Sequence, residues 1–168
     1  MRNPNRRTAA SVLVLGLCLA IAFTLSCAAR SDKADDAKVA EEAVRQQIAK
    51  YTAALDAADI DLASQVWLTS PGVSFIHPGG HAHGWEEVKG IYSFFGSSFA
   101  ERKLTARDVS VHVNGDTAWA EFYWHFVAKP SNGGVSIQTD GRETQVYNKV
   151  GNRWQLVHAH YSGPAMTP

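Results

Sequence analysis

Cysteine is scarce in the sequence, with two residues in 168, and both Cys18 and Cys27 lie near the N-terminus. We therefore expect no disulfide inside the folded part of the chain. An excess of basic residues is also lacking, because 16 lysines and arginines balance 16 acidic residues. Binding to a phosphate backbone requires a basic surface, so we expect no nucleic-acid partner. The sequence shows no glycine-rich phosphate loop and no nucleophile beside an activating partner, and we predict no cofactor.

Only one long apolar run is present, from about Thr8 to Leu25, and three arginines precede it. A charged segment followed by an apolar one predicts a secretory signal peptide, which we assign to residues 1–27. Its removal leaves 13 of the 16 basic residues against 16 acidic ones, a net charge of about −3. We therefore expect an exported protein.

The end of this leader, Thr24-Leu25-Ser26-Cys27, resembles a bacterial lipobox. That resemblance implies lipidation of Cys27, which would hold the protein at a membrane facing the periplasm or the cell exterior, without crossing it. The small and charged residues 28–38 would then form a tether. Ordinary cleavage near Ala28, which would release a secreted protein, is the alternative.

Helical periodicity marks the first part of the predicted domain, residues 39–168. Apolar residues recur on one face between 37 and 57, Asp59 can cap a second short helix that ends near Trp67, and a third helix carries apolar residues from Val88 to Phe99. The apolar positions of the first helix are Val44, Ile48, Tyr51 and Leu55.

Alternation with a period of two replaces this pattern after Arg102 and predicts strands. The predicted strands are 72–77, a short 81–84, 103–113, 117–128, 136–150 and 153–162. Asn114-Gly115-Asp116 is a strong hairpin signal, because asparagine and glycine accept positive φ. Helices followed by a four-stranded antiparallel meander predict an α+β domain.

The predicted strand 117–128 is apolar on both faces. Trp119, Tyr123 and Val127 share the face opposite Trp124 and Phe126. Leaving large aromatic side chains in water forgoes about 1.5–3 kcal/mol each. We therefore predict self-association through the outer face of the sheet, as a homodimer or a larger assembly.

Two segments resemble one known superfamily. The segment KYTAALDAADIDLASQVWLTSPGVSFIHP, residues 50–78, resembles the start of ketosteroid isomerases of the nuclear transport factor 2-like superfamily. The run from Glu143, with Glu-Thr-x-Val and Trp-x-x-Val-His-x-His, resembles the end of the calcium/calmodulin-dependent protein kinase II association domain and of its SnoaL-like relatives. The resemblance implies a cone-like curved antiparallel β-sheet packed against three N-terminal helices.

The resemblance to ketosteroid isomerase also implies three catalytic positions. Tyr51 matches the tyrosine that hydrogen-bonds the substrate oxygen. His77 stands where the isomerase has its aspartate base, and Gln145 stands where it keeps a protonated aspartic acid. Histidine can act as a base near neutral pH, or serve as a polar anchor, and glutamine can donate a hydrogen bond.

A metal site is the competing interpretation of the three histidines in FIHPGGHAHGW, residues 75–85. His81 and His83 share a strand face with Glu86 or Glu87 just beyond, which is a legitimate ligand set. We favour an exposed hairpin and predict no metal site. His158 and His160 are expected to share a face with Trp154 and Leu156, bonded to neighbouring strands or to a ligand.

Alternation separates Arg142 from Glu143 and Gln145, and we place Arg142 on the outer or rim side. The other expected ligand-binding residues are Trp67, Phe75, Tyr92, Trp124, Glu143, His158 and His160. We expect the pocket to bind a small apolar or carboxylate-bearing molecule. The chemistry, if any, would be acid–base proton transfer beside a carbonyl, as in an isomerase, dehydratase or cyclase. The alternative is a non-catalytic assembly module resembling the kinase association domain.

Overall fold

The computed structural model describes residues 35–163. The chain divides into two units, Met1–Val39 and Ala40–Pro168, and the elements discussed below belong to the second, except for residues 35–39 at the start of the first helix. Cys27 and the predicted leader lie outside the described residues, so export and lipidation stay predictions. No helix within residues 35–163 has the length and apolar character needed to span a membrane.

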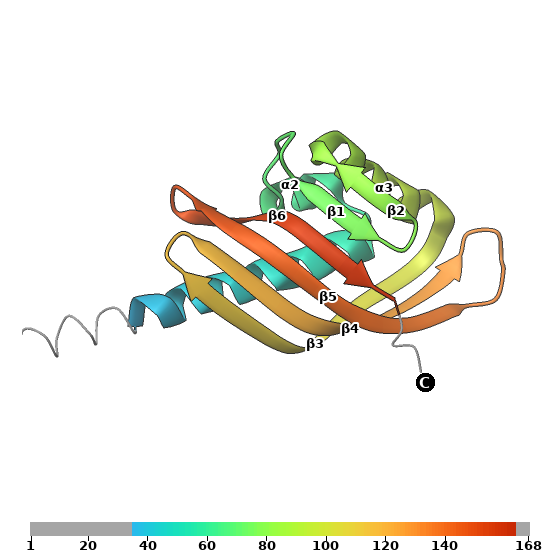
Figure 1. The fold of residues 1–168 in the computed structure, drawn as a ribbon. Helices are drawn as coiled ribbons and strands as arrows, with labels where there is room; N and C mark the ends of the chain where they lie inside the picture. The colour runs from blue at the N-terminus through green and yellow to red at the C-terminus, as the bar shows by residue number, and fades with distance from the viewer. Residues whose placement is uncertain (1–34, 164–168) are drawn as a thin grey trace, which may run out of the picture. The chain divides into compact units, whose positions relative to one another are not determined.

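Within the described residues, two helices precede the first strand, and a third lies between the first two strands of the sheet and the four long ones (Figure 1). The first occupies residues 35–57, α2 is Ile60–Val66 and α3 is Gly84–Ser98. The Asp59 side chain caps α2 by accepting a hydrogen bond from the Leu62 N–H at 2.9 Å, as predicted from its place before the apolar run. The predicted apolar face of the first helix is confirmed, since Val44, Ile48 and Tyr51 are buried.

Six strands form a single open sheet in the order β2-β1-β6-β5-β4-β3. Their bounds are β1 Ser74–His77, β2 Gly80–His83, β3 Phe99–Asn114, β4 Thr117–Pro130, β5 Ile137–Val150 and β6 Arg153–Ser162. The predicted meander β3 to β6 is confirmed, and so is the β1–β2 hairpin. The sheet is mixed rather than wholly antiparallel, because β1 pairs with β6 in parallel.

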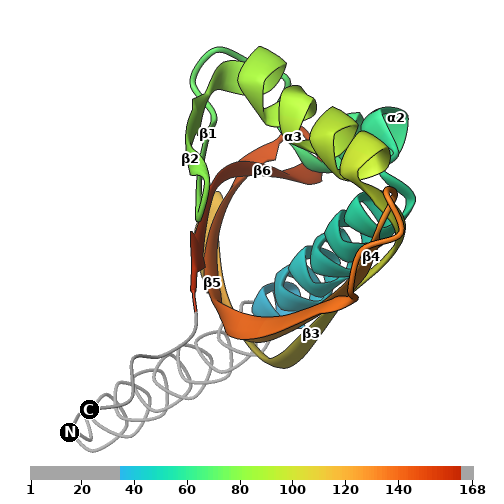
Figure 2. The same ribbon diagram turned by 90° about the vertical axis from the view of Figure 1, so that its right-hand side faces the viewer.

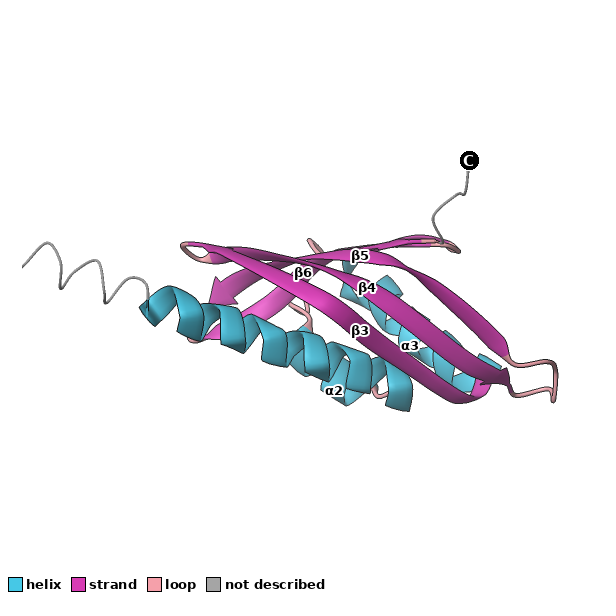
Figure 3. Ribbon diagram, turned by 90° about the horizontal axis from the view of Figure 1, so that it is seen from below, coloured by secondary structure: helices cyan, strands magenta, loops and turns pink. Residues whose placement is uncertain are grey.

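The long strands β3, β4 and β5 curve, and the helices lie along the concave side (Figures 2 and 3). Alternation along β4 is strict: Ala118, Ala120, Phe122 and Trp124 are buried, and the residues between them are not. The concave face therefore supplies one wall of the core, and the apolar stripes of the helices supply the other.

The opposite face of β4 is exposed, as predicted. Trp119 is 40% exposed, Tyr123 51% and Val127 38%, and Trp119 stacks on His112 of β3. These three residues, with their outer-face neighbours on β3 and β5, are called the outer aromatic face below.

The prediction that His158 and His160 share a face with Leu156 is wrong. Tyr147 pairs with Leu156 but Val146 pairs with His158, so Val157 is an extra residue in β6. Such a bulge reverses the alternation. Beyond it, Ala159 is buried and His160 is exposed.

Candidate functional site

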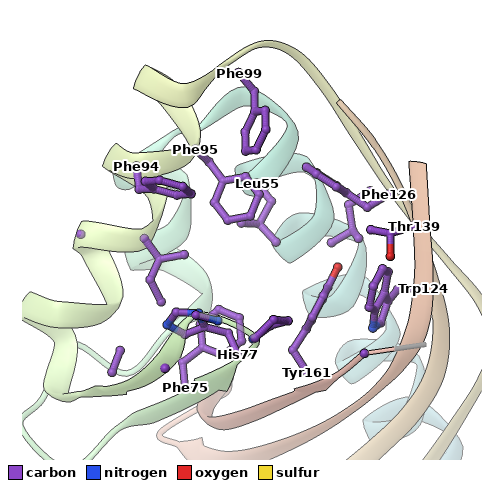
Figure 4. A pocket seen from close by; sticks show the side chains of 18 of the residues that line it. Leu55, Phe75, His77, Phe94, Phe95, Phe99, Trp124, Phe126, Thr139 and Tyr161 are labelled. Atoms are coloured by element: carbon purple, nitrogen blue, oxygen red, sulfur yellow. The ribbon is translucent and has the colours of Figure 1, made fainter. Parts of the chain in front are cut away.

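A cavity of about 860 Å³ lies between the concave face of the sheet and the helices. Figure 4 shows aromatic side chains from α3, β1, β4 and β6 around it. Its lining includes Tyr51, Leu55, Phe75, His77, Glu87, Ile91, Phe94, Phe95, Phe99, Leu104, Trp124, Phe126, Ile137, Thr139 and Tyr161, together with the turn Pro78–Gly80. Most of this surface is apolar. Among the described residues that line the cavity there is no lysine or arginine.

Trp124 and Tyr161 form one wall of the cavity. Their rings stack with centroids 4.2 Å apart and planes 17° apart, and the Tyr161 hydroxyl points into the cavity (Figure 4). The indole lies against Gly141, its partner on β5. A Cβ at position 141 would stand 2.3 Å from the indole and 2.2 Å from the Ser162 carbonyl oxygen, so only glycine lets Trp124 lie flat there.

A row of polar side chains is buried beside this wall. Glu143, Gln145 and Tyr147 alternate inward along β5 and are 2%, 0% and 0% exposed. The Tyr147 hydroxyl donates to Gln145 Oε1, and Gln145 Nε2 donates to Glu143 Oε1 at 2.8 Å. Arg142 is exposed, which confirms the predicted division of β5. The row therefore holds the Glu143 carboxyl in one orientation.

Two atoms of this polar region have no hydrogen-bond partner among the described residues: Tyr51 Oη and Glu143 Oε2. Burial raises the pKa of Glu143 to about 8, and the hydrogen bond from Gln145 counteracts part of that rise. The Tyr51 hydroxyl lies near the same carboxyl and acts in the same direction, although the two groups make no hydrogen bond of ordinary geometry. Burial, and then the nearby Glu143, raise the pKa of Tyr51 well above its usual value. Near neutral pH both groups therefore keep their protons, and Tyr51, which lines the cavity, presents a hydroxyl donor.

Trp67 and Tyr92 are buried and bonded to each other. The Trp67 Nε1–H donates to the Tyr92 hydroxyl oxygen at 3.0 Å, and neither residue is among those that line the cavity. Burial raises the pKa of Tyr92. This hydrogen bond links the end of α2 to α3, and both side chains lie behind the residues that line the cavity.

His77 stands at the end of β1, half-buried, and lines the cavity. Its Nδ1 accepts the Gly79 N–H at 3.2 Å, so the neutral ring carries its proton on Nε2. Burial, and then the nearby His81, lower its pKa. In this arrangement the ring is uncharged at neutral pH and offers a donor.

The predicted site residues separate into two groups. Tyr51, Phe75, His77 and Trp124 line the cavity, whereas the others lie behind it or on the outer face. Those others are Trp67, Tyr92, Glu143, Gln145, His158 and His160.

Sequence reasoning missed most of the aromatic lining, notably Tyr161. Among the described residues, no three or more His, Cys, Asp or Glu side chains are placed to hold a metal ion.

The chain resembles known proteins over most of its length. The model of the SnoaL-like domain matches residues 44–166. A nuclear transport factor 2-like superfamily protein from Salmonella enterica is 38% identical, with a TM-score of 0.75 over 78% of this chain and 95% of that one. A search of curated proteins gives no match.

Two further solved structures are similar in fold. A candidate dehydratase of the nuclear transport factor 2-like family from Streptomyces avermitilis is 24% identical, with a TM-score of 0.68 over 77% of this chain and 99% of that one. The structure of LinA is 15% identical, with a TM-score of 0.68 over 77% and 89% of the two chains.

Replacing Gly141 by alanine should lower the free energy of unfolding by about 1–3 kcal/mol, because the added methyl group overlaps Trp124 and the Ser162 carbonyl. Urea denaturation followed by tryptophan fluorescence measures this. Gly90→Ala is the matched control: nothing lies within 4 Å of the added Cβ, and alanine favours the helix by up to about 1 kcal/mol. Equal stability of Gly141→Ala and the native protein would contradict the packing described.

Glu143 should make the protein less stable as pH rises from about 4.5 to about 8. In that range the unfolded chain releases a proton that the folded protein keeps. Each pH unit therefore lowers the free energy of unfolding by up to about 1.4 kcal/mol. Glu143→Gln should remove this slope, whereas Glu121→Gln, at an exposed position on β4, should preserve it. Denaturation midpoints measured across this pH range provide the comparison, and an unchanged slope in Glu143→Gln would refute the burial of a protonated carboxyl.

Proposed function

Because the chain belongs to the SnoaL-like domain family of the nuclear transport factor 2-like superfamily, we propose that its cavity binds a small, uncharged, largely apolar molecule that carries a carbonyl or hydroxyl oxygen. We further propose that it catalyses acid–base proton transfer on that molecule, as an isomerase or a lyase such as a dehydratase.

The observation that carries this proposal is the Tyr51 hydroxyl. It is buried and lines a mainly apolar cavity, and although it lies near the Glu143 carboxyl it makes no hydrogen bond of ordinary geometry among the described residues. An unsatisfied buried polar group costs about 1–3 kcal/mol. A ligand oxygen at this position removes that cost and gains a hydrogen bond, so the cavity favours molecules that place an acceptor beside Tyr51.

Two types of ligand were predicted from the sequence, apolar and carboxylate-bearing. The cavity lining favours the apolar type. Seven phenylalanine, tryptophan and tyrosine side chains besides Tyr51 contact the cavity: Phe75, Phe94, Phe95, Phe99, Trp124, Phe126 and Tyr161. A carboxylate would find no cationic lysine or arginine among the described lining residues, and it would approach the buried Glu143. A neutral ring system with one polar end fits this wall better.

His77 is the proposed proton-transfer group. In the structure, His77 Nδ1 accepts a hydrogen bond from the Gly79 N–H, so the Nε2–H is the ring's available donor. This arrangement supports the role of polar anchor. If the half-buried His77 ring rotates about its Cβ–Cγ bond, the unprotonated Nδ1 separates from the Gly79 amide. It can then act as a base and accept a proton from the bound molecule. The reaction class agrees with two fold relatives that are candidate dehydratases, one from Streptomyces avermitilis and one described as a candidate scytalone dehydratase from Novosphingobium aromaticivorans.

The neutral aromatic ketone 1-tetralone is a suitable probe. We expect it to bind, and Tyr51→Phe to weaken binding by about fivefold, since one hydrogen bond is worth on the order of 1 kcal/mol. Calorimetry measures binding, and proton NMR in D₂O measures exchange of the ketone's α-protons. His77→Ala should abolish enzyme-dependent exchange without altering the melting temperature.

Two results would count against the proposal. Exchange at the native rate in His77→Ala would exclude His77 as the proton-transfer group. Binding unaffected by Tyr51→Phe would exclude the hydroxyl as the ligand's partner. Thr52→Ala, one residue away on the same helix and bonded only to the Ala49 carbonyl, is the matched control and should behave as the native protein.

We also propose that the outer aromatic face mediates self-association, as a dimer or as a ring like that of the kinase association domain. Trp119→Gln with Tyr123→Gln should then yield a monomer in light scattering on the protein lacking residues 1–27. Val135→Gln is the control, since Val135 is 90% exposed but lies outside that face. A native protein that is already monomeric would refute the proposal, and a ring of many subunits would favour the assembly role.

A further inference from the structure

A second phenol hydroxyl, that of Tyr161, lies at the cavity besides that of Tyr51. Tyr161 is half-buried on β6 and pairs with the buried Glu143 of the neighbouring strand β5. Residues paired across neighbouring strands project to the same side of a sheet, so the Tyr161 ring stands on the concave face beside the Glu143 side chain. Its hydroxyl points into the cavity (Figure 4).

Aromatic packing holds the Tyr161 ring in this position. The ring stacks on Trp124, with centroids 4.2 Å apart, and meets Phe75 edge to face at 6.4 Å. Trp124 is itself held flat against Gly141 of β5. The hydroxyl is therefore aimed into the cavity before any ligand enters, and a preorganised donor costs little conformational entropy on binding.

The two hydroxyls belong to one cluster with the Glu143 carboxyl. Burial and then Glu143 raise the pKa of Tyr161, and Tyr161 is among the groups that, after burial and Glu143, raise the pKa of Tyr51. Coulomb interactions weaken with distance, so these groups lie at the same end of the cavity. Within residues 35–163, Glu143 accepts its hydrogen bond of ordinary geometry from Gln145 rather than from either of these tyrosines. Both hydroxyls therefore keep a proton to donate to a ligand.

From this arrangement we propose that Tyr161 is a further catalytic residue, which donates a second hydrogen bond to the ligand oxygen that Tyr51 binds. The inference rests on the proposed function of the cavity and specifies its ligand as a ketone. A carbonyl oxygen accepts two hydrogen bonds through its two lone pairs, and it has no proton of its own to place between two donors.

The second donor acts on the proton-transfer step. When His77 takes a proton from the carbon beside the carbonyl, the C–H electron pair forms a carbon–carbon double bond and the carbonyl π electrons move onto oxygen. The negative charge then lies between the two phenols, where fixed donors stabilise it more strongly than they stabilise the neutral ketone. Return of a deuteron from D₂O to the same carbon completes the exchange, so no further reactant is needed.

Calorimetry with 1-tetralone and with tetralin, its analogue without oxygen, tests the inference. The native protein should prefer 1-tetralone. Tyr51→Phe and Tyr161→Phe should each lower this preference by about fivefold, because phenylalanine keeps the ring and removes only the hydroxyl. The affinity for tetralin should change by less than about twofold, which also shows that the cavity of each variant is intact.

Two further measurements report on the donor itself. Exchange of the α-protons at saturating 1-tetralone should slow by about a hundredfold in Tyr161→Phe, as expected when one donor to a developing negative charge is lost. The ¹³C resonance of the bound, carbonyl-labelled ketone should move upfield in both variants, because each hydrogen bond to the oxygen moves it downfield. Tyr123→Phe, which removes an exposed hydroxyl from the outer aromatic face, is the matched control and should leave all three readouts at native values.

The outcomes separate this inference from the proposed function. A preference lowered by Tyr51→Phe but not by Tyr161→Phe would overturn the inference and leave the proposed function in place. Exchange at the native rate in Tyr161→Phe, or an equal loss in Tyr123→Phe, would also overturn the inference. A native protein that binds neither compound, or binds both equally, would overturn both.

The ¹³C resonance of the ketone bound to Tyr51→Phe decides the question if Tyr161→Phe unfolds. A second donor keeps that resonance downfield of its position in hexane. Coincidence of the two positions would refute the inference.

Discussion

The burial of one carboxyl group, that of Glu143, constrains the interior of this protein. Alternation along β5 turns Glu143, Gln145 and Tyr147 into the core, where every polar atom needs a partner. The row Tyr147 to Gln145 to Glu143 satisfies one carboxyl oxygen, and the other stays without a bond, as does the Tyr51 hydroxyl. Glu143, Gln145 and Tyr147 lie behind the cavity, whereas Tyr51 lines it. The buried polar row therefore meets the cavity through the Tyr51 hydroxyl.

Two irregularities of the sheet decide which aromatic and imidazole rings face the hollow. The bulge at Val157 turns Tyr161 inward, where it stacks on Trp124, and turns His158 and His160 outward. The parallel pairing of β1 with β6 then brings the β1–β2 hairpin beside them. Without the bulge the two histidines would replace Tyr161 against the cavity. The same residue that shapes the pocket wall thus places imidazoles on the opposite surface.

Much of the fold could be predicted because its periodicity is local. The stripe of Val44, Ile48 and Tyr51 and the alternation of Ala118 to Trp124 each follow from neighbouring residues. The bulge could not, because Val157 fits a regular strand equally well and only pairing with Val146 and Tyr147 shows that it is extra. The family resemblance supplied Tyr51, His77 and Gln145. The aromatic lining from α3 depends on where that helix crosses the sheet, which no local pattern records.

The electrostatics of the interior also bear on what the cavity can accept. Burial raises the pKa of Glu143 to about 8, so below that pH the polar end of the cavity is uncharged. Above it, a carboxylate forms beside Tyr51 with no lysine or arginine among the described lining residues to balance it. An anionic ligand would meet repulsion at high pH and no attraction at low pH, since a desolvated charge needs a paired partner. A neutral molecule meets neither penalty below pH 8. The absence of a counter-charge would therefore produce the proposed preference for a neutral ligand, which the aromatic lining alone, able to accept any planar group, would not impose.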